Sequence, residues 1–250
     1  MPDSVERFSD RVDNYVKFRP SYPAEAIDCL IENTHIAGQA TAADIGSGTG
    51  KFTELLLERG FSVYAVEPNA NMRAAAEKAL TSFSNFHSVN GSAEETSLSD
   101  DLVDVITVAT AFHWFDRDKC KPEFQRILKC GGKTALVWNN YDKTGSPIMA
   151  EYEALIRPSH EESSKLARER VTGGMYDDFF VRYDRYYFTN GQRFDFDGLW
   201  GRAQSSSYSP NLGHPDYEKL KAALRELFEK YQQGGTIDFA YKTELIVGTI

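Results

Sequence analysis

A glycine-rich turn and one acidic residue beyond it carry the clearest chemical meaning in this sequence. Gly46, Gly48 and Gly50 follow a short apolar run and precede an amphipathic segment. Glycines let the backbone turn tightly and approach a ligand, and a helix that starts there offers unpaired N–H groups. Glu67 ends the next apolar run, where a carboxylate can accept both hydroxyls of a ribose. The two features together predict a nucleoside-binding site.

The spacing of the glycines favours one nucleoside cofactor over another. The dinucleotide fingerprint is G-x-G-x-x-G, whereas residues 46–50 read G-x-G-x-G and follow Asp44. S-adenosylmethionine (SAM) has no phosphate, and an acidic residue ahead of the glycines suits its cationic side. We therefore interpret the turn as a SAM site, with a structural turn that binds no ligand as the alternative. For the function of the protein, an NAD(P)-dependent oxidoreductase is the alternative, and a non-catalytic SAM-binding protein is a second one.

These residues need a scaffold, and the first half of the chain alternates strand-like and helix-like segments. Apolar, β-branched runs predict strands at 41–45, 62–66, 86–89, 103–109 and 134–138. Helical spacing predicts helices at 51–59, 69–80 and 117–129, with Gly131 and Gly132 ending the last one. Buried strands separated by helices are typical of a parallel sheet that is covered on both faces.

The remainder of the chain departs from this alternation. A helix that starts with proline is predicted at 23–33, ahead of the first strand. Beyond Trp138 the patterns predict helices at 146–156, 161–171 and 216–232, and strands at 182–188 and 243–250. The interruption from 139 to about 180 is typical of a lid or a substrate wall.

Length, charge and cysteine content narrow the class of protein. A chain of 250 residues suits one α/β domain, and its net charge of −9 without a Lys/Arg run disfavours a nucleic-acid partner. Cys29, Cys120 and Cys130 form no CxxC pair and are expected to be reduced thiols. The polar N-terminus, the absence of a long apolar run and the absence of metal-ligand spacing predict a cytoplasmic protein without metal or membrane partner. We expect a monomer or a homodimer.

Four ordered motifs resemble those of class I SAM-dependent methyltransferases. They are DIGSGTGKFT, VEPNANM, GSAEETSL and VDVITVATAFHWFD, and the N-terminal stretch FSDRVDNYVKFRPSYP resembles a cofactor-covering segment. The chain is similar to the type 11 methyltransferase domain family, which includes trans-aconitate and ubiquinone/menaquinone-type enzymes. The resemblance implies a Rossmann-like, doubly wound, mostly parallel seven-stranded sheet of order 3-2-1-4-5-7-6 with helices on both faces. It also implies a single domain, divided into a covering segment at 1–35, a SAM-binding core at 36–140, a lid at 141–180 and C-terminal strands and helix at 181–250.

The resemblance assigns roles to individual residues. Asp44, Gly46, Ser47, Gly48 and Gly50 would hold the methionine end and the ribose edge of SAM, and Glu67 would accept the ribose hydroxyls. The remaining cofactor contacts would come from the adenine side, from the end of the fourth strand and from the covering segment: Pro68, Met72, Ser92, Ala93, Glu94, Ala109, Thr110, Tyr15 and Arg19. Ser92 stands where many relatives have Asp, so Glu94 is the alternative partner of the adenine amino group.

The acceptor is predicted to be a small molecule with a carboxylate or hydroxyl oxygen. His113 follows the fourth strand and is the candidate general base, with a packed core histidine as the alternative. Phe112, Trp114 and Phe115 would wall the acceptor pocket or form core. Arg170, Arg182 and Arg185 could bind an acceptor carboxylate, and aromatic residues between 176 and 187 could line the pocket or pack as a strand.

Overall fold

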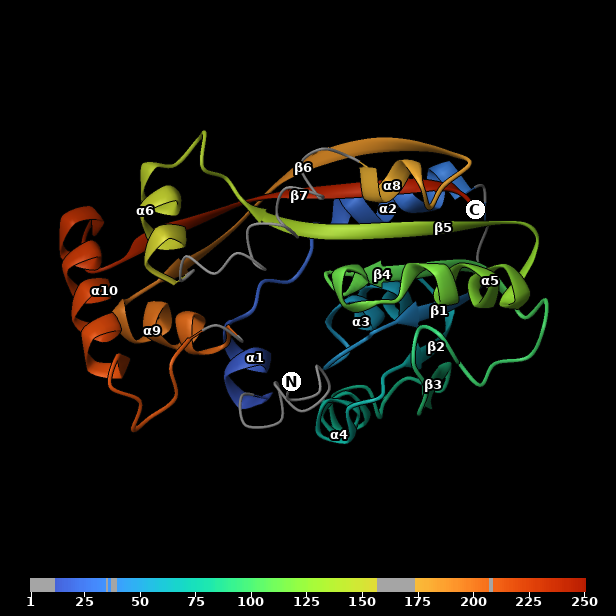
Figure 1. Cartoon of the computed structure of the whole chain (residues 1–250), viewed down its shortest axis with the longest axis horizontal. Helices are drawn as coiled ribbons and strands as arrows, with labels where there is room; N and C mark the ends of the chain where they lie inside the picture. The colour runs from blue at the N-terminus through green and yellow to red at the C-terminus, as the bar shows by residue number, and fades with distance from the viewer. Residues whose placement is uncertain (1–11, 35, 37–39, 157–173, 207–208) are drawn as a thin grey trace.

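One sheet organises the part of the chain that the structure describes. The computed structural model describes residues 12–34, 36, 40–156, 174–206 and 209–250. The sheet has seven strands in the order β3-β2-β1-β4-β5-β7-β6 (Figure 1), which confirms the predicted order. Its strands are β1 (Thr41–Ile45), β2 (Ser62–Val66), β3 (Phe86–Val89), β4 (Val103–Ala109), β5 (Leu128–Tyr141), β6 (Arg182–Phe194) and β7 (Ile237–Thr249).

The sheet is mixed, so the prediction of a mostly parallel sheet needs correction. The pairs β2–β3, β1–β2, β1–β4 and β4–β5 are parallel. Strand β7 is antiparallel to both of its neighbours, β5 and β6. Helical crossovers connect the pairs β1–β2, β2–β3 and β4–β5, as is usual for parallel strands. Because these parallel strands all point the same way, their carboxyl ends share one edge.

Helices cover both faces of the sheet, as predicted. On one face, Phe124 and Phe179 pack with Ile106 and Leu136 in a single core cluster. On the other face, a second cluster contains residues of α2 and α3. The helices in the described part of the chain are α1 (Val12–Phe18), α2 (Ala24–Thr34), α3 (Lys51–Glu58), α4 (Ala70–Ala79), α5 (Arg117–Ile127), α6 (Pro147–Ile156), α8 (Gly174–Asp177), α9 (Phe196–Gln204), α10 (Tyr217–Tyr231) and the 3₁₀ turn η2 (Phe112–Trp114).

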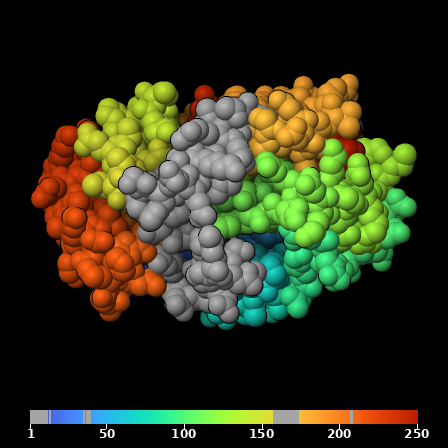
Figure 2. Space-filling view, viewed as in Figure 1, coloured from blue at the N-terminus to red at the C-terminus, as the bar shows by residue number. Residues whose placement is uncertain are grey.

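Three long strands carry a separate group of helices. Strands β5, β6 and β7 have 14, 13 and 13 residues, and they continue past the other strands to meet α6, α9 and α10 (Figure 1). A third core cluster fills this end, with Tyr152, Leu224 and Phe239 at its centre. We call these three helices and the strand ends beneath them the helical cluster. The space-filling view shows it in yellow, orange and red at one end of the molecule (Figure 2).

Several boundaries differ from the sequence predictions. The helix predicted to reach Lys129 ends at Ile127, and β5 starts at once, with Gly131 at φ +81° beside a shift in the β4–β5 register. A glycine in the left-handed region at a bulge keeps the strand going where a helix stop was predicted. Strand β6 runs on to Phe194, and β7 begins earlier, at Ile237. The helix predicted at 161–171 lies outside the described residues, and the lid stays a prediction.

Helix α1 contacts the helical cluster through one aromatic ring. A Cβ built at Gly201, in the middle of α9, would overlap the ring of Phe18. Phe18 ends α1, so this contact fixes where the N-terminal segment crosses the molecule. Neither α1 nor α9 was predicted, because each is short and its pattern is weak.

We predict that Gly201→Ala destabilises the protein by about 1–3 kcal/mol, because the added methyl displaces the Phe18 ring. Helix propensity alone would change stability by up to about 1 kcal/mol in the opposite direction. Chemical denaturation measures the difference. The double variant Gly201→Ala/Phe18→Leu is expected to recover part of the loss, and a single variant more stable than the parent would contradict the docking.

Candidate functional site

The glycine-rich turn follows the carboxyl end of β1 and is hydrogen-bonded to the carboxyl end of β2. The amides of Gly46 and Ser47 both donate to the carbonyl of Val66, at 2.8 Å and 3.2 Å. The three glycines have φ values of +69°, +58° and +83°. Positive φ disfavours residues with a Cβ, so the backbone path itself selects glycine at these positions.

The three glycines have different surroundings. A Cβ at Gly46 would lie 2.7 Å from the Cβ of Ala111, and one at Gly50 would lie 2.8 Å from Leu80 Cδ1. These two glycines therefore also permit close packing of the turn on its neighbours. A Cβ at Gly48 would meet nothing within 4 Å. Gly48 thus faces open space, and a ligand can approach the backbone there.

The carboxylate of Glu67 points at this turn. Its Oε2 accepts a hydrogen bond from the Gly48 amide at 2.9 Å, and Oε1 accepts one from the Asn69 amide at 2.8 Å. Glu67 is 8% exposed. Burial raises its pKa, while the two amide hydrogen bonds oppose that rise. A carboxylate has about four acceptor positions, so two remain for the hydroxyls of a ligand.

Asp44 lies beneath the turn and is fully buried. Oδ2 accepts from the Thr53 hydroxyl at 2.6 Å, and Oδ1 accepts from the Thr107 hydroxyl at 3.0 Å. Burial, together with the charge of nearby Glu67, raises the pKa of Asp44 to about 6, and the two threonine hydrogen bonds oppose this rise. The residue thus joins β1 to α3 and β4 and places an ionisable group below the glycines.

The predicted adenine residues lie at the ends of β2 and β3, which are neighbouring strands. Pro68 is half-buried and Met72 is buried, in the first turn of α4, whose N-cap is Asn69. In the loop after β3, the Ser92 hydroxyl accepts from the Glu95 amide at 3.2 Å. Ala93 is buried in the core cluster of that face, and Glu94 Oε1 accepts from the Asp116 amide at 2.9 Å.

The end of β4 is held in an unusual backbone conformation. Thr110 has φ +59°, its amide donates to Val137, and Ala109 before it is half-buried. A β-branched residue in this region is strained, and such strain is common at functional sites. The Thr110 hydroxyl lies 3.0 Å from the hydroxyl of Tyr22. Tyr22 was not singled out from the sequence, although it lies within the stretch FSDRVDNYVKFRPSYP.

The aromatic stretch after β4 consists of one core residue followed by three half-buried ones. Phe112 is fully buried against Phe179, with ring centroids 4.7 Å apart, so it belongs to the core. His113 is half-buried, and its ring lies 4.7 Å from Trp114 and 5.6 Å from Trp138. His113 lies four residues after the end of β4, on the 3₁₀ turn η2.

Tyr15 and Arg19 come from α1 and the residue after it. The guanidinium of Arg19 lies 5.0 Å from the centroid of the Tyr15 ring. Arg19 Nη2 donates to the carbonyl of Ser205 at 2.9 Å, which ties this segment to the end of α9.

Of the three arginines predicted to bind an acceptor carboxylate, Arg185 already has a carboxylate partner and Arg182 is exposed. Arg185 is 3.7 Å from the Glu244 carboxylate and lies over the rings of Tyr176 and Tyr183. Arg182 is exposed at the start of β6, and Arg170 lies outside the described residues. Tyr176 is buried in the core like its neighbours Phe179 and Phe180.

The described residues contain neither a candidate membrane span nor a candidate metal site. No described helix is both long enough and apolar enough to span a bilayer. The described residues contain no group of three or more His, Cys, Asp or Glu side chains placed to hold a metal ion.

Comparison with known proteins agrees with this geometry. A family model described as "Methyltransferase domain" matches residues 43–136. An uncharacterized methyltransferase of Mycobacterium tuberculosis (strain ATCC 25618 / H37Rv) is 42% identical over 136 residues, which is 54% of this chain and 53% of the relative. One of Schizosaccharomyces pombe is 26% identical over 259 residues, covering 96% and 97%. The chain thus matches about half the length of the mycobacterial relative.

Solved structures show the same fold. A putative type II methyltransferase from Anaeromyxobacter dehalogenans has a TM-score of 0.64 at 23% identity, covering 93% of this chain and 98% of that one. A putative SAM-dependent methyltransferase from Methanococcus maripaludis has a TM-score of 0.57 at 24% identity, covering 74% and 90%. At these identities the likeness concerns the fold alone.

The raised pKa of Asp44 predicts how stability depends on pH. The native carboxyl holds its proton up to about pH 6, whereas an unfolded one loses it near 3.8, so this residue makes the protein less stable as the pH rises between them. Relative to Asp44→Asn, the wild type is expected to lose up to about 3 kcal/mol between pH 4 and pH 7.

Denaturation midpoints across that range measure the difference. The exposed residue Asp184 provides the control variant Asp184→Asn, which should give no such trend. A constant difference between wild type and Asp44→Asn at every pH would contradict the prediction.

Proposed function

We propose that this chain, which carries a class I SAM-dependent methyltransferase domain, transfers a methyl group from SAM to a small-molecule acceptor by in-line displacement. The matched domain and the fold support the cofactor and the reaction class. The oxygen that accepts the methyl group, a carboxylate or a hydroxyl, belongs to the proposal.

The observation that carries the proposal is the placement of Glu67 against the glycine turn. Its carboxylate lies on the Gly48 amide, at the one glycine of the turn that faces open space. The turn and Glu67 therefore combine an acceptor for ribose hydroxyls with room beside the backbone. Both features suit an adenosyl group, which offers two vicinal hydroxyls and needs close backbone approach.

We assign the other predicted residues around these two. Asp44, Gly46, Ser47 and Gly50 would hold the methionine end. Ala109 and Thr110 would lie beside the sulfonium, and Tyr15 and Arg19 would cover the site. The adenine would lie near four residues from the ends of β2 and β3 and from α4: Pro68, Met72, Ala93 and either Ser92 or Glu94.

The chemistry of the site needs few protein groups. Bound SAM supplies a methyl group that is already activated on a sulfonium. The chain contributes by aligning the acceptor with that methyl group and by excluding water. His113, four residues after the end of β4, would take the proton that a hydroxyl acceptor loses. Trp114, Phe115 and buried Trp138 would form the apolar wall on that side.

The proposal also covers the class of acceptor, the division of the chain and the oligomeric state. The net charge of −9 opposes binding to a phosphate backbone, so we propose small-molecule acceptors and no nucleic acid. We retain the division into a covering segment at 1–35, a core at 36–140, a lid at 141–180 and a C-terminal part at 181–250. A cytoplasmic monomer or homodimer is part of the same proposal.

Calorimetric titration with S-adenosylhomocysteine (SAH) tests the cofactor site. We expect saturable binding, and Glu67→Gln is expected to weaken it by about 1–3 kcal/mol because the variant accepts fewer hydrogen bonds from the ribose. Glu95→Gln, at an exposed carboxylate in the loop after β3, is the matched control. Absence of binding to the wild type would end the proposal, and an unchanged Glu67→Gln would remove that residue from the site.

Single-turnover transfer from methyl-labelled SAM tests the role of His113. Screening metabolites for label uptake finds an acceptor, and His113→Ala is then expected to slow transfer by about 100-fold while SAH affinity stays unchanged. Equal rates would leave His113 a packed aromatic neighbour. A screen without any labelled product would favour the non-catalytic SAM-binding alternative.

A further inference from the structure

A buried arginine in the helical cluster has only neutral partners. Arg202 on α9 is 3% exposed. Its Nε donates to the Tyr241 hydroxyl at 2.8 Å, its Nη2 to the Tyr141 hydroxyl at 3.1 Å, and its Nη1 to the Ser205 hydroxyl at 3.4 Å. A guanidinium has five N–H donors, so one on each terminal nitrogen is left over.

The positive charge of Arg202 is uncompensated within the described residues. None of the ion pairs between described residues includes Arg202 or Arg19. Buried charges are normally paired, because removing a cation from water costs several kcal/mol. The rings of Tyr141, Phe239 and Tyr241 lie 5.7 to 5.8 Å from the guanidinium and offset part of that cost.

Near Arg202, two other buried donors, Arg19 Nε and the Tyr152 hydroxyl, also lack hydrogen-bond partners among the described residues. Arg19 and Arg202 both contact Ser205, and Nε of Arg19 is buried without a hydrogen-bond partner in the described part of the chain. The hydroxyl of Tyr152 on α6 is likewise buried and unpartnered, and its ring lies 5.6 Å from that of Tyr141. Burial raises the pKa of Tyr152, so the hydroxyl keeps its proton and can donate. Two cations and a neutral donor are thus linked through Ser205 and Tyr141.

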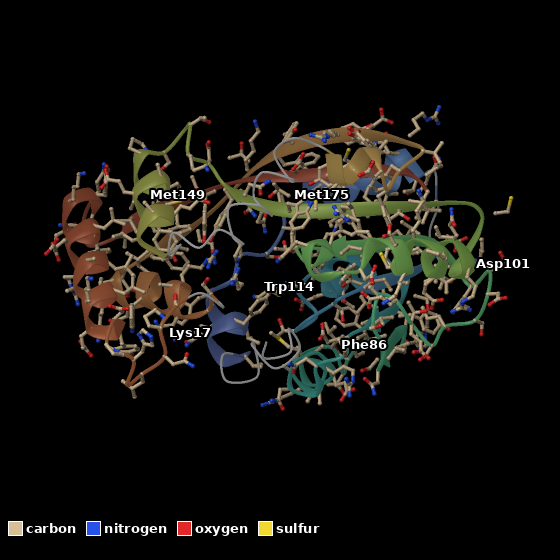
Figure 3. All side chains as sticks on the ribbon, viewed as in Figure 1. Lys17, Phe86, Asp101, Trp114, Met149 and Met175 are labelled. Atoms are coloured by element: carbon tan, nitrogen blue, oxygen red, sulfur yellow. The ribbon has the colours of Figure 1, made fainter. Side chains whose placement is uncertain are left out.

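The position of this group relates it to the proposed methyl-transfer site. Val137 of β5 pairs with Ala109 at the end of β4, and Tyr141 comes four residues later along β5. At a strand rise of about 3.3 Å per residue, Tyr141 lies about 13 Å beyond the end of β4. In the view of Figure 3, α1, which carries Lys17, lies between the helical cluster and Trp114.

Hydrogen bonds connect the buried arginine to the N-terminal segment. The Tyr241 hydroxyl, which accepts from Arg202, donates to Gln192 Oε1 at 3.1 Å, and Gln192 Nε2 donates to the Phe18 carbonyl at 3.3 Å. Further along this segment, Tyr22 reaches Thr110 at the end of β4. The arginine and the strand end therefore border the same stretch of chain.

We infer that Arg202, Arg19 and the Tyr152 hydroxyl bind the carboxylate of a small organic acid that is the methyl acceptor. The planar guanidinium fork matches the two oxygens of a carboxylate. Because the group lies beyond the end of β4, this carboxylate orients the acceptor, and the methylated atom is at the other end of the molecule. The inference rests on the proposed methyl-transfer function.

Binding of simple acids to the SAH-saturated protein tests this site. The probes are butyrate and benzoate, compared with butyramide and benzamide at constant ionic strength, by calorimetry and thermal shift. We expect the acids to bind and to raise Tm, and the amides to do neither. Arg202→Met is expected to weaken acid binding by at least about 10-fold, and Arg202→Lys by less because the charge remains. SAH affinity should be unchanged in both variants.

Two further variants keep the test decisive. Arg225→Met removes an exposed arginine that also lies over a ring, that of Phe196, and it should leave acid binding intact. Tyr152→Phe removes only the unpartnered hydroxyl and is expected to weaken acid binding several-fold, even if Arg202→Met fails to fold. Acid binding that is absent, or equal in wild type and Tyr152→Phe, overturns the inference. Loss of SAH binding alone would instead count against the proposed function.

Discussion

The hydrogen bond from the Gly48 amide to the Glu67 carboxylate is the interaction on which the candidate site depends. It joins the ends of two neighbouring parallel strands, beside the open space at Gly48. The carbonyl of Val66 holds the same turn from below. Because a carboxylate keeps acceptor positions after taking two amide hydrogen bonds, Glu67 can shape the turn and still face a ligand.

Asp44 and Arg202 are both buried and ionisable, but they differ in how their neighbours compensate their charge. Asp44 has a hydroxyl donor on each oxygen, so its hydrogen bonds offset part of the desolvation cost. Arg202 has hydroxyl acceptors but no carboxylate among the described residues. A buried polar group normally has hydrogen-bond partners, and one that lacks them needs another explanation, such as a role in binding. Asp44 has such partners, whereas we infer a role in binding for Arg202.

Because three of its strands are longer than the others, one sheet carries both the candidate site at the glycine turn and the helical cluster. Strands β1 to β4 are short; β1 ends at the glycine turn and β4 ends just before Thr110. Strands β5, β6 and β7 continue and pair antiparallel, and this lets them cross to a second core without leaving the sheet. Aromatic side chains from this extension meet α6 and α9 around Arg202. A rigid extension of this kind can hold an acceptor at a fixed distance from the cofactor site.

The sequence alone determined the first half of the parallel sheet and the positions of the glycine turn and of Glu67. Strong apolar periodicity gave the positions of β1, β2 and β4 without error, and local glycine chemistry located the turn beside Glu67. These features depend on neighbours in the chain, so the sequence pattern predicts them.

The group around Arg202 comes from α1, α6, α9, β5 and β7, which are far apart in sequence. No local pattern distinguishes a buried arginine from an exposed one. The bulge at Gly131, the docking of Phe18 on Gly201 and the contact of Tyr22 with Thr110 were likewise decided by tertiary packing, because each depends on which surfaces meet.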